Sequence, residues 1–351
     1  MPFTMPAVVT RVTLLSAVIA APLTAQWTPL PSGTTASLRG LSVVDARTAW
    51  ASGTRGTIVH TTDGGASWRV DSIAGGGALD LRAIHARSPR IAHVAATAGR
   101  IYRTTDGGRS WTLRVIQASD TSVFLDAIDF WDDQHGIALG DPMDGRFFLL
   151  LTRDGGDTWH EPAIDERPAT EDGEAAFAAS GSSLLLLGTS DSLVAWIGSG
   201  GKAARMHRSM NRGRSWVAYP TPMRQGGSSE GIFSVAAIPG GGMLIVGGHY
   251  AQDDSTRGNA AASRDGTEWR ALTDGGPRGY RSGVAFARTD SAPALGIAVG
   301  PGGSDISRDA GNRWEPFDRA GYHAVRASRD GIFYASGSGG RLARFDAKPT
   351  R

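Results

Sequence analysis

The sequence predicts an all-β protein, a seven-bladed β-propeller made of four-stranded antiparallel blades. Three observations predict this fold: an eight-residue motif recurs along the chain, short apolar runs alternate with turn residues around each copy, and 48 of the 351 residues are glycine. Abundant glycine suits many tight turns between short strands, and it does not suit a helical bundle. Because the repetition extends over most of the chain, we expect one domain.

The recurring motif, here called the Asp-box, ends in tryptophan. Its six copies are TTDGGASW at 61–68, TTDGGRSW at 104–111, TRDGGDTW at 152–159, SMNRGRSW at 209–216, SRDGTEW at 263–269 and SRDAGNRW at 307–314. Successive tryptophans are 43, 48, 57, 53 and 45 residues apart. This is the period of propeller blades.

The Asp-box residues predict a structural role. Asp-Gly-Gly favours a hairpin turn with positive φ, the aspartate can accept hydrogen bonds from the amides of its own turn, and the tryptophan holds the turn by burial. Repetition of the same residues argues against catalysis at any one copy. The structural Asp-box residues are Asp63, Trp68, Asp106, Trp111, Asp154, Trp159, Asn211, Trp216, Asp265, Trp269, Asp309 and Trp314.

Four short strands are expected in each blade, from alternating apolar and small residues. The expected blades span about 38–72, 81–116, 123–164, 173–220, 230–273, 280–318 and 322–346. The last stretch has no Asp-box and lacks a fourth strand, which residues 26–31 can supply because Trp27 lies where a box tryptophan lies elsewhere. The N-terminal strand therefore closes the ring, the propeller spans 26–346, and 347–351 form a tail.

Residues 1–25 have the order of a secretory signal: Arg11, an apolar run over 12–21, Pro22, and small residues ending at Ala25. The run is about half the length that a membrane-spanning helix needs, so we expect cleavage before Gln26, export to the periplasm or the medium, and no stable membrane span afterwards. The chain has no cysteine, so its stability has to come from packing and ring closure. We expect a monomer.

The Asp-boxes resemble the bacterial neuraminidase (BNR) repeat of sialidases, other glycoside hydrolases and sortilin-type receptors. A closer resemblance is to the photosystem II stability and assembly factor family and its secreted bacterial relatives, some of which carry an oxidoreductase label. It rests on the frame GTRGTI at 53–58 and its echoes at 99–101 and 339–342, and on segments 124–145, 247–250 and 279–287. The resemblance implies a cofactor-free, seven-bladed binding platform that recognises a protein or peptide partner.

Charged residues recur at the expected start of the innermost strand of each blade. Such starts converge on the central channel of a propeller, where they form a candidate ligand-binding funnel. A salt-bridge ring that fixes neighbouring blades is the competing interpretation. The candidate funnel residues are Arg39, Arg82, Asp126, Glu174, Glu230, Arg281 and His323.

A sialidase-like glycoside hydrolase is the alternative function. Arg39, Arg82 and Arg281 could form its arginine triad, with Tyr280 or Tyr322 as nucleophile beside Glu230 or Glu174. The carboxylates of Asp141 and Asp144, and of Glu171, Asp172 and Glu174, also offer acid and base pairs. The Arg-Ile-Pro signature of sialidases is absent, so no catalytic residue is assigned and a non-catalytic protein is favoured.

Other chemistry finds little support in the sequence. His249 with Asp253 and Asp254 is the best metal-like cluster, but such spacing is common in loops, so no metal site is assigned. A cofactor-dependent oxidoreductase ranks third, because no Rossmann glycine pattern, haem-attachment cysteine or P-loop is present, and no cofactor is expected. A net charge of +2 with scattered arginines argues against nucleic-acid binding.

Overall fold

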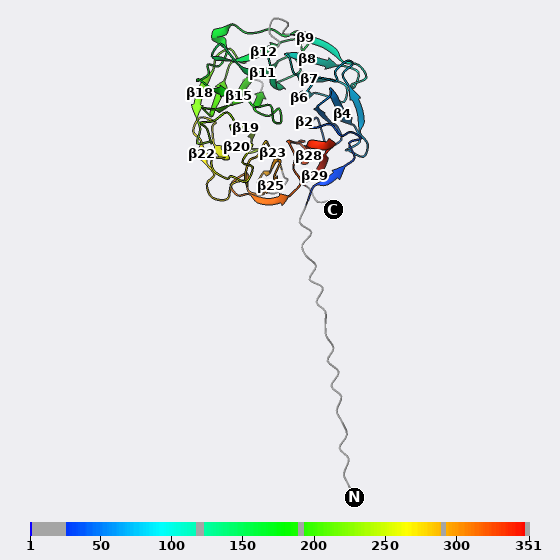
Figure 1. Cartoon of the computed structure of the whole chain (residues 1–351), viewed down its shortest axis with the longest axis vertical. Helices are drawn as coiled ribbons and strands as arrows, with labels where there is room; N and C mark the ends of the chain where they lie inside the picture. Colours follow the sequence, from blue (N-terminus) through cyan, green and yellow to red (C-terminus); the bar gives the residue numbers. More distant parts are fainter. Residues whose placement is uncertain (2–25, 117–122, 189–192, 289–292, 348–351) are drawn as a thin grey trace.

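The computed structural model describes Met1 and residues 26–116, 123–188, 193–288 and 293–347. The chain forms a closed ring of seven antiparallel blades, seen face on in Figure 1. Each innermost strand contacts the innermost strand of the next blade, and the seventh contacts the first. The predicted fold class is confirmed. The expected signal segment lies outside the described residues.

Three blades follow the simple four-stranded pattern, in which consecutive strands pair from the channel to the rim. Blade 1 has β2 (Leu38–Val43), β3 (Ala49–Gly53), β4 (Thr57–Thr61) and β5 (Arg69–Ser72). Blade 2 has β6 (Leu81–Ala86), β7 (Ala92–Ala96), β8 (Arg100–Thr104) and β9 (Thr112–Ile116). Blade 6 has β23 (Gly283–Ala287), β24 (Leu295–Gly300), β25 (Gly303–Ser307) and β26 (Glu315–Asp318).

Blades 3, 4 and 5 depart from this pattern. Blade 3 has β10 (Leu125–Phe130), β11 (Gly136–Met143) and β12 (Arg146–Thr152), and a bridge from Leu151 to His160 stands for its outer strand. Blade 4 has β14 (Leu184–Gly188), β15 (Leu193–Gly198), β17 (Arg205–Ser209) and β18 (Val217–Pro220). Blade 5 has β19 (Glu230–Ala237), β20 (Met243–His249), β21 (Ala260–Ser263) and β22 (Arg270–Ala271). The short β13 (Glu174–Ala175) and β16 (Gly200–Gly201) extend the sheet of blade 5.

The innermost strand of blade 4 begins at Leu184, later than expected from the sequence. Residues 173–183 therefore do not start the blade as predicted. They form an insertion between blades 3 and 4, which explains why the spacing of 57 residues between Trp159 and Trp216 is the longest in the chain. The 3-10 turn η1 (Ile164–Glu166) precedes this insertion.

Blade 7 joins the two ends of the chain. It has β27 (Ala324–Ala327), β28 (Ile332–Ser336) and β29 (Leu342–Asp346), with the 3-10 turn η2 (Ser338–Gly340) between the last two. The N-terminal strand β1 (Thr28–Leu30) pairs with β29 and completes the blade, as predicted. Closure of this kind leaves no inner sheet edge exposed.

The Asp-box connects neighbouring blades as well as closing a turn. In each box a glycine with positive φ lies against a side chain of the preceding blade, so that a Cβ on Gly156 would be 2.3 Å from His93 Nε2 and one on Gly266 would be 2.2 Å from Trp196. Only glycine fits so close an approach in this backbone region. The core is correspondingly divided into apolar clusters that lie between adjacent blades.

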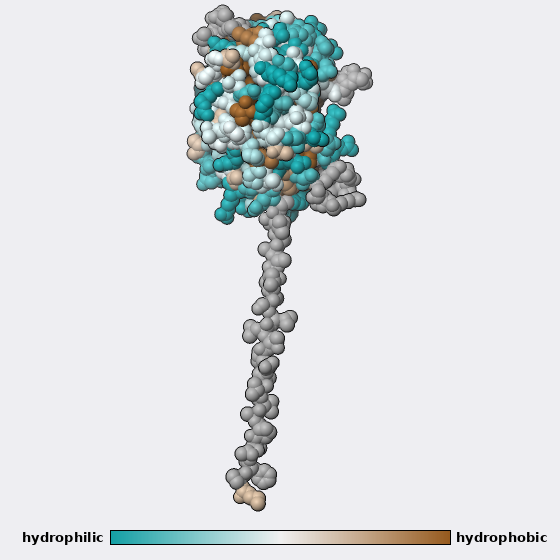
Figure 2. All heavy atoms as spheres, turned by 90° about the vertical axis from the view of Figure 1, so that its right-hand side faces the viewer, coloured by the Kyte–Doolittle hydropathy of each residue, from teal (hydrophilic) through white to brown (hydrophobic). Residues whose placement is uncertain are grey.

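The outer surface is mainly hydrophilic. Figure 2 views the rim beside β4 and β8 and shows hydrophobic side chains only in small separate patches. Val70, Leu113 and Val217, on outermost strands, are among the exposed apolar residues. Among the described residues, no helix is long and apolar enough to cross a membrane.

Candidate functional site

A pocket of about 350 Å³ opens near the starts of the innermost strands. It is lined by cationic, aromatic and small residues from blades 1, 2, 5, 6 and 7 and from the insertion before blade 4. The lining residues are Arg39, Arg82, Phe177, Ala178, Ala179, Phe233, Tyr250, Tyr280, Ser282, Pro301 and His323. Of the seven candidate funnel residues, Arg39, Arg82 and His323 meet here.

A repeated β-bulge positions the arginines. Arg39 and Arg82 each lie at a register shift, between Leu38 and Gly40 and between Leu81 and Ala83. A bulge adds one unpaired residue to a strand and redirects its side chain. Asp126 occupies the same position in blade 3, and Phe233 occupies it in blade 5.

The two arginines differ in how their charge is compensated. Arg82 Nε donates to Asp80 Oδ2 over 2.6 Å, and its guanidinium lies 5.5 Å from the ring of Phe124. Within the described part of the chain no carboxylate forms an ion pair with Arg39. Burial and the charge of Arg82 lower the pKa of Arg39. The pocket therefore contains a partly buried cation with no ion pair of its own: the carboxylate of Asp80 acts on its charge but is paired with Arg82.

Aromatic rings form one wall of the pocket. Phe177 and Phe233 stack with centroids 4.0 Å apart and planes 13° apart, and Tyr280 meets Phe233 edge to face at 4.8 Å. Tyr250 remains half exposed beside them. A cationic base next to apolar rings suits a ligand that has an anionic group close to an apolar one.

His323 contributes hydrogen bonds to the pocket and no positive charge at neutral pH. Its Nε2 lies 2.8 Å from Ser338 Oγ and 3.3 Å from Ser37 Oγ. Burial, followed by the charges of Arg39 and Arg82, lowers the pKa of His323 to about 4. The ring is thus neutral where the arginines are charged.

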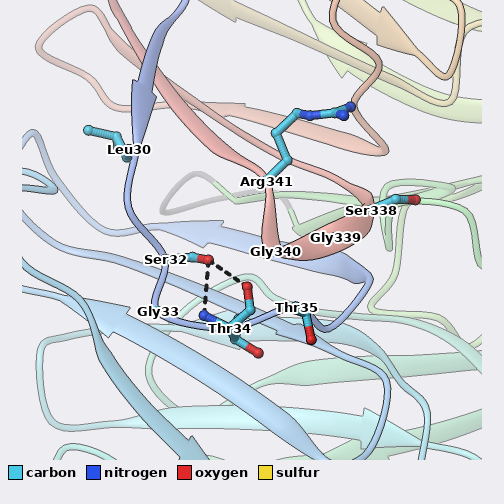
Figure 3. Close-up of a pocket in the computed structure, with 9 residues that line it drawn as sticks. All are labelled: Leu30, Ser32, Gly33, Thr34, Thr35, Ser338, Gly339, Gly340 and Arg341. Atoms are coloured by element: carbon cyan, nitrogen blue, oxygen red, sulfur yellow. Dashed lines mark hydrogen bonds between the residues drawn. The ribbon is translucent and has the colours of Figure 1, made fainter.

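A shallow hollow adjoins the pocket at the ring closure. Figure 3 shows its lining: the segment from Leu30 to Thr35 on one side and the turn from Ser338 to Arg341 on the other. Ser338 belongs to this hollow and contacts His323 in the pocket, so the two lie side by side. A chain that leaves the pocket on this side would run past the Arg341 side chain.

Asp126 lies deeper than the arginines that share its bulge position. It is 2% exposed, its Oδ2 has no hydrogen-bond partner among the described residues, and it does not line the pocket. Burial, then the neighbouring Asp141 carboxyl group, raises the pKa of Asp126. Burial also raises the pKa of Asp141. The carboxyl groups of Asp126 and Asp141 therefore interact.

The remaining three candidate residues lie outside the pocket. Arg281 is 3% exposed and forms an ion pair with Asp305, with Nη2 2.6 Å from Oδ2. Glu230 pairs with Arg224. Glu174 is in β13 and not at the start of an innermost strand, because the insertion displaces that start to β14. The single register expected for all seven residues is wrong for these three.

The arrangement does not favour the glycoside hydrolase alternative. A triad that includes Arg281 is not assembled, since this guanidinium is engaged by Asp305. Burial raises the pKa of Tyr322 to about 12 and also raises that of Tyr280, which opposes formation of a nucleophilic phenolate. Within the described ranges no group of three His, Asp or Glu side chains could hold a metal ion.

The Asp-box residues all lie in the turns expected for them. In the third box Thr152 Oγ1 donates to Asp154 Oδ1 over 2.9 Å, and Thr158 N donates to the same oxygen over 2.9 Å. In the fourth, Asn211 Oδ1 accepts from Ser209 Oγ and Ser215 N at 3.0 and 2.9 Å, so an amide serves in place of a carboxylate.

We expect the Asp-boxes to make the stability of the protein fall in acid. Burial raises the pKa of Asp154, but hydrogen bonds from Thr158 and Thr152 outweigh it and hold this pKa at about 2. A lowered folded-state pKa contributes stability that is complete above the unfolded pKa of about 4 and is lost as the pH falls through 2. Asp154→Asn should therefore flatten the pH dependence of unfolding between these values, measured by urea titration at several pH values. An unchanged dependence would contradict this account, and Asn211→Asp should act in the opposite direction.

Comparison with known proteins supports the resemblance that the Asp-boxes and the blade pattern indicated. Residues 33–123, which include blades 1 and 2, match the family model described as photosynthesis system II assembly factor YCF48. The resemblance to photosystem II assembly factor-like, BNR-repeat propellers is confirmed. No curated protein matches the chain.

Solved structures with the same fold extend over almost the whole chain. YCF48 bound to D1 peptide is 16% identical with a TM-score of 0.62, over 92% of this chain and 97% of that one. YCF48 from Cyanidioschyzon merolae is 17% identical with a TM-score of 0.61, over 92% and 99%. A streptogramin B lyase is 11% identical with a TM-score of 0.58, over 91% and 96%. At these identities the likeness concerns the fold, which hosts both binding proteins and an enzyme.

Proposed function

We propose that this chain is an exported, non-catalytic binding and assembly module that recognises a protein or peptide segment at the central pocket. The observation that carries the proposal is the Arg39 guanidinium, which lies beside Arg82 without a carboxylate partner and faces an aromatic wall. A carboxylate from a ligand would supply the ion pair that Arg39 lacks, and an adjacent apolar or aromatic group would pack on Phe233 and Tyr280.

Two further observations support a peptide over a small sugar. The hollow at the ring closure lies beside the pocket, since Ser338 of its lining contacts His323, and it offers further surface for an extended chain. YCF48, which has the same fold, has been solved bound to a D1 peptide.

The segment 1–25 has the composition of a secretory signal, which supports export.

Binding of short synthetic peptides tests the proposal. The probes pair an aromatic residue with a neighbouring Asp or Glu, and matched controls carry Asn or Gln in its place. Fluorescence anisotropy should detect binding of the acidic peptides, and Arg39→Gln should weaken it by about tenfold or more, since a hydrogen bond to a charged group contributes about 1.5–3 kcal/mol.

The matched control is Arg329→Gln, which removes an exposed arginine outside the pocket. It should leave the affinity unchanged. Equal weakening by both substitutions would indicate nonspecific attraction to positive charge, and unchanged affinity in Arg39→Gln would remove the pocket from the proposal.

A further inference from the structure

Residues 176–183, here called the partition, cross the central channel. Ser180 Oγ donates to the backbone oxygen of Ser282 in blade 6 over 2.6 Å, and Ser182 Oγ donates to Ser234 Oγ in blade 5 over 2.8 Å. Arg326 of blade 7 donates to the backbone oxygen of Gly181 over 3.2 Å. On the side of blade 2, a Cβ on Gly181 would be 3.1 Å from that of Ala83. One segment thus contacts four blades that surround the axis.

The partition separates two cavities. The pocket described above, about 350 Å³, has Phe177, Ala178 and Ala179 of the partition in its wall. A second cavity, about 320 Å³, is lined by later residues of the innermost strands, such as Leu41, Ile84 and Val284, and by Gly181 and Ser182 of the partition. This segment is therefore a wall that the two cavities share.

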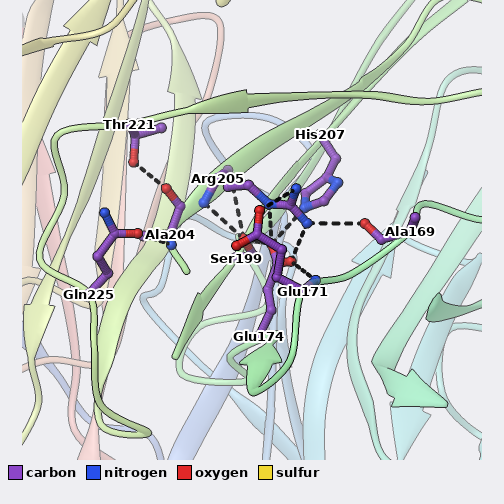
Figure 4. Close-up of polar contacts among 9 residues, drawn as sticks. All are labelled: Ala169, Glu171, Glu174, Ser199, Ala204, Arg205, His207, Thr221 and Gln225. Atoms are coloured by element: carbon purple, nitrogen blue, oxygen red, sulfur yellow. Dashed lines mark hydrogen bonds and ion pairs between the residues drawn. The ribbon is translucent and has the colours of Figure 1, made fainter. Parts of the chain in front are cut away.

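A cluster of polar side chains surrounds Glu174, just before the start of the partition, and Figure 4 shows its contacts. Glu174, two residues before it, accepts hydrogen bonds from His207 Nε2 over 2.8 Å and from Arg205 Nε over 3.2 Å, and Ser199 Oγ donates to the same carboxylate. His207 and Glu174 are almost fully buried. Burial raises the pKa of Glu174, but the hydrogen bonds from His207 and Arg205 outweigh it and hold the pKa at about 2. The carboxylate of Glu174 thus remains ionised at neutral pH.

We infer that Glu174 is a positioning residue for the binding pocket: it fixes the partition, and the partition sets the depth of the pocket and places Phe177 against Phe233. This inference rests on the proposed function only for what the pocket binds. It assigns to the insertion before blade 4 a role in ligand selection, although Glu174 touches no ligand. A displaced partition opens the pocket into the second cavity and removes one ring of the aromatic stack.

Hydrogen exchange with peptide-level mass spectrometry tests the inference without a ligand. In Glu174→Ala the amides of 176–183 should exchange at least about tenfold faster than in the wild type, while the Asp-box amides near Asp106 and Asp309 keep their rates. In Glu174→Gln, which retains a hydrogen-bond acceptor, the amides of 176–183 should exchange at a rate between those of Glu174→Ala and the wild type. Faster exchange throughout the ring would show that Glu174 stabilises the whole fold and would overturn the specific role, as would unchanged exchange in the partition.

A second variant acts on the far end of the partition. Ser180→Ala removes the hydrogen bonds of this hydroxyl to Ser282 and to Ser182 and leaves the Glu174 cluster intact, so it remains informative if Glu174→Ala does not fold. We expect faster exchange of the partition here as well, and unchanged exchange in this variant would count against the partition being held at both ends.

Peptide affinity then separates this inference from the proposed function. Glu174→Ala and Ser180→Ala should weaken the acidic peptides by about tenfold with Arg39 and Arg82 unchanged, because the binding surface is no longer preorganised. A wild type that binds none of the peptides refutes the proposed function while the exchange result still decides the role of Glu174. A mobile partition with unchanged peptide affinity refutes the role in binding alone.

Discussion

Replacing Arg281 with alanine is expected to lower the free energy of unfolding by about 3–5 kcal/mol, the cost of removing one partner of a buried ion pair. The Arg281 and Asp305 side chains are 4% and 1% exposed, and Nε and Nη2 of the arginine both contact Oδ2 of the aspartate. Without Arg281 the Asp305 carboxylate stays buried and keeps only weaker partners, among them the Arg278 amide. Equilibrium denaturation in urea measures the loss.

Two comparisons make this result specific. The double variant Arg281→Met, Asp305→Leu removes both charges and should recover much of the stability, since apolar pairs often replace buried ion pairs without loss. Arg39→Ala removes a guanidinium that has no ion-pair partner, so it should cost far less. A small effect in Arg281→Ala, equal to that in Arg39→Ala, would contradict the distinction drawn between a structural and a binding arginine.

Trp27→Ala should destabilise the ring by about 3–5 kcal/mol, the range found when a large buried aromatic side chain is truncated in a core. Trp27 is 5% exposed, its ring lies 5.5 Å from those of Phe317 and Tyr322, and its Nε1 donates to Ser304 Oγ over 3.0 Å. It therefore connects the closing strand β1 to blades 6 and 7. Thermal unfolding followed by circular dichroism measures the effect.

Trp27→Phe is the matched control, since it retains most of the apolar area and loses the hydrogen bond. Its free energy of unfolding should be much closer to that of the wild type than the value for Trp27→Ala. If the two variants were equally stable and both resembled the wild type, closure by β1 would contribute little and the ring would be held by its other interfaces.

The fold was predictable because the Asp-box occurs six times, and each copy indicates one turn of one blade. Asp63, Asp106 and Asp154 lie at the same position of successive turns, so an error at one copy leaves the period intact. Closure was predictable for a similar reason, because Trp27 provides a box-like tryptophan at the point where one blade lacked a strand.

The candidate site was predictable only where the repeat continues to the innermost strand. Arg39 and Arg82 share a bulge and reach the pocket, but Arg281 lies one residue before the position that corresponds to them, Ser282, and turns instead into the blade to meet Asp305. The position of Glu174 was not predictable, because the insertion has no counterpart in the other blades and the repeat therefore gives no register there.

The aromatic wall was not predicted at all. Phe177 belongs to the insertion, Tyr250 follows β20, and Phe233 occupies a bulge position where other blades have charged residues. The sequence does contain one signal for Phe233. If the segment EGIFSVAA is aligned with the other innermost strands by the position of the bulge, and not by its first charged residue, Phe233 falls in register with Arg39.

Pairing of β1 with β29 also constrains how the protein can be made. Among the strands of the ring, β1 is synthesised first and its partner β29 last, so the ring cannot close until β29 has left the ribosome. Until then, β29 and the interface beside Trp27 are missing, and an interrupted product would retain an unpaired sheet edge that invites aggregation. A chain interrupted before β29 should therefore be cleaved by proteases more readily than the closed ring.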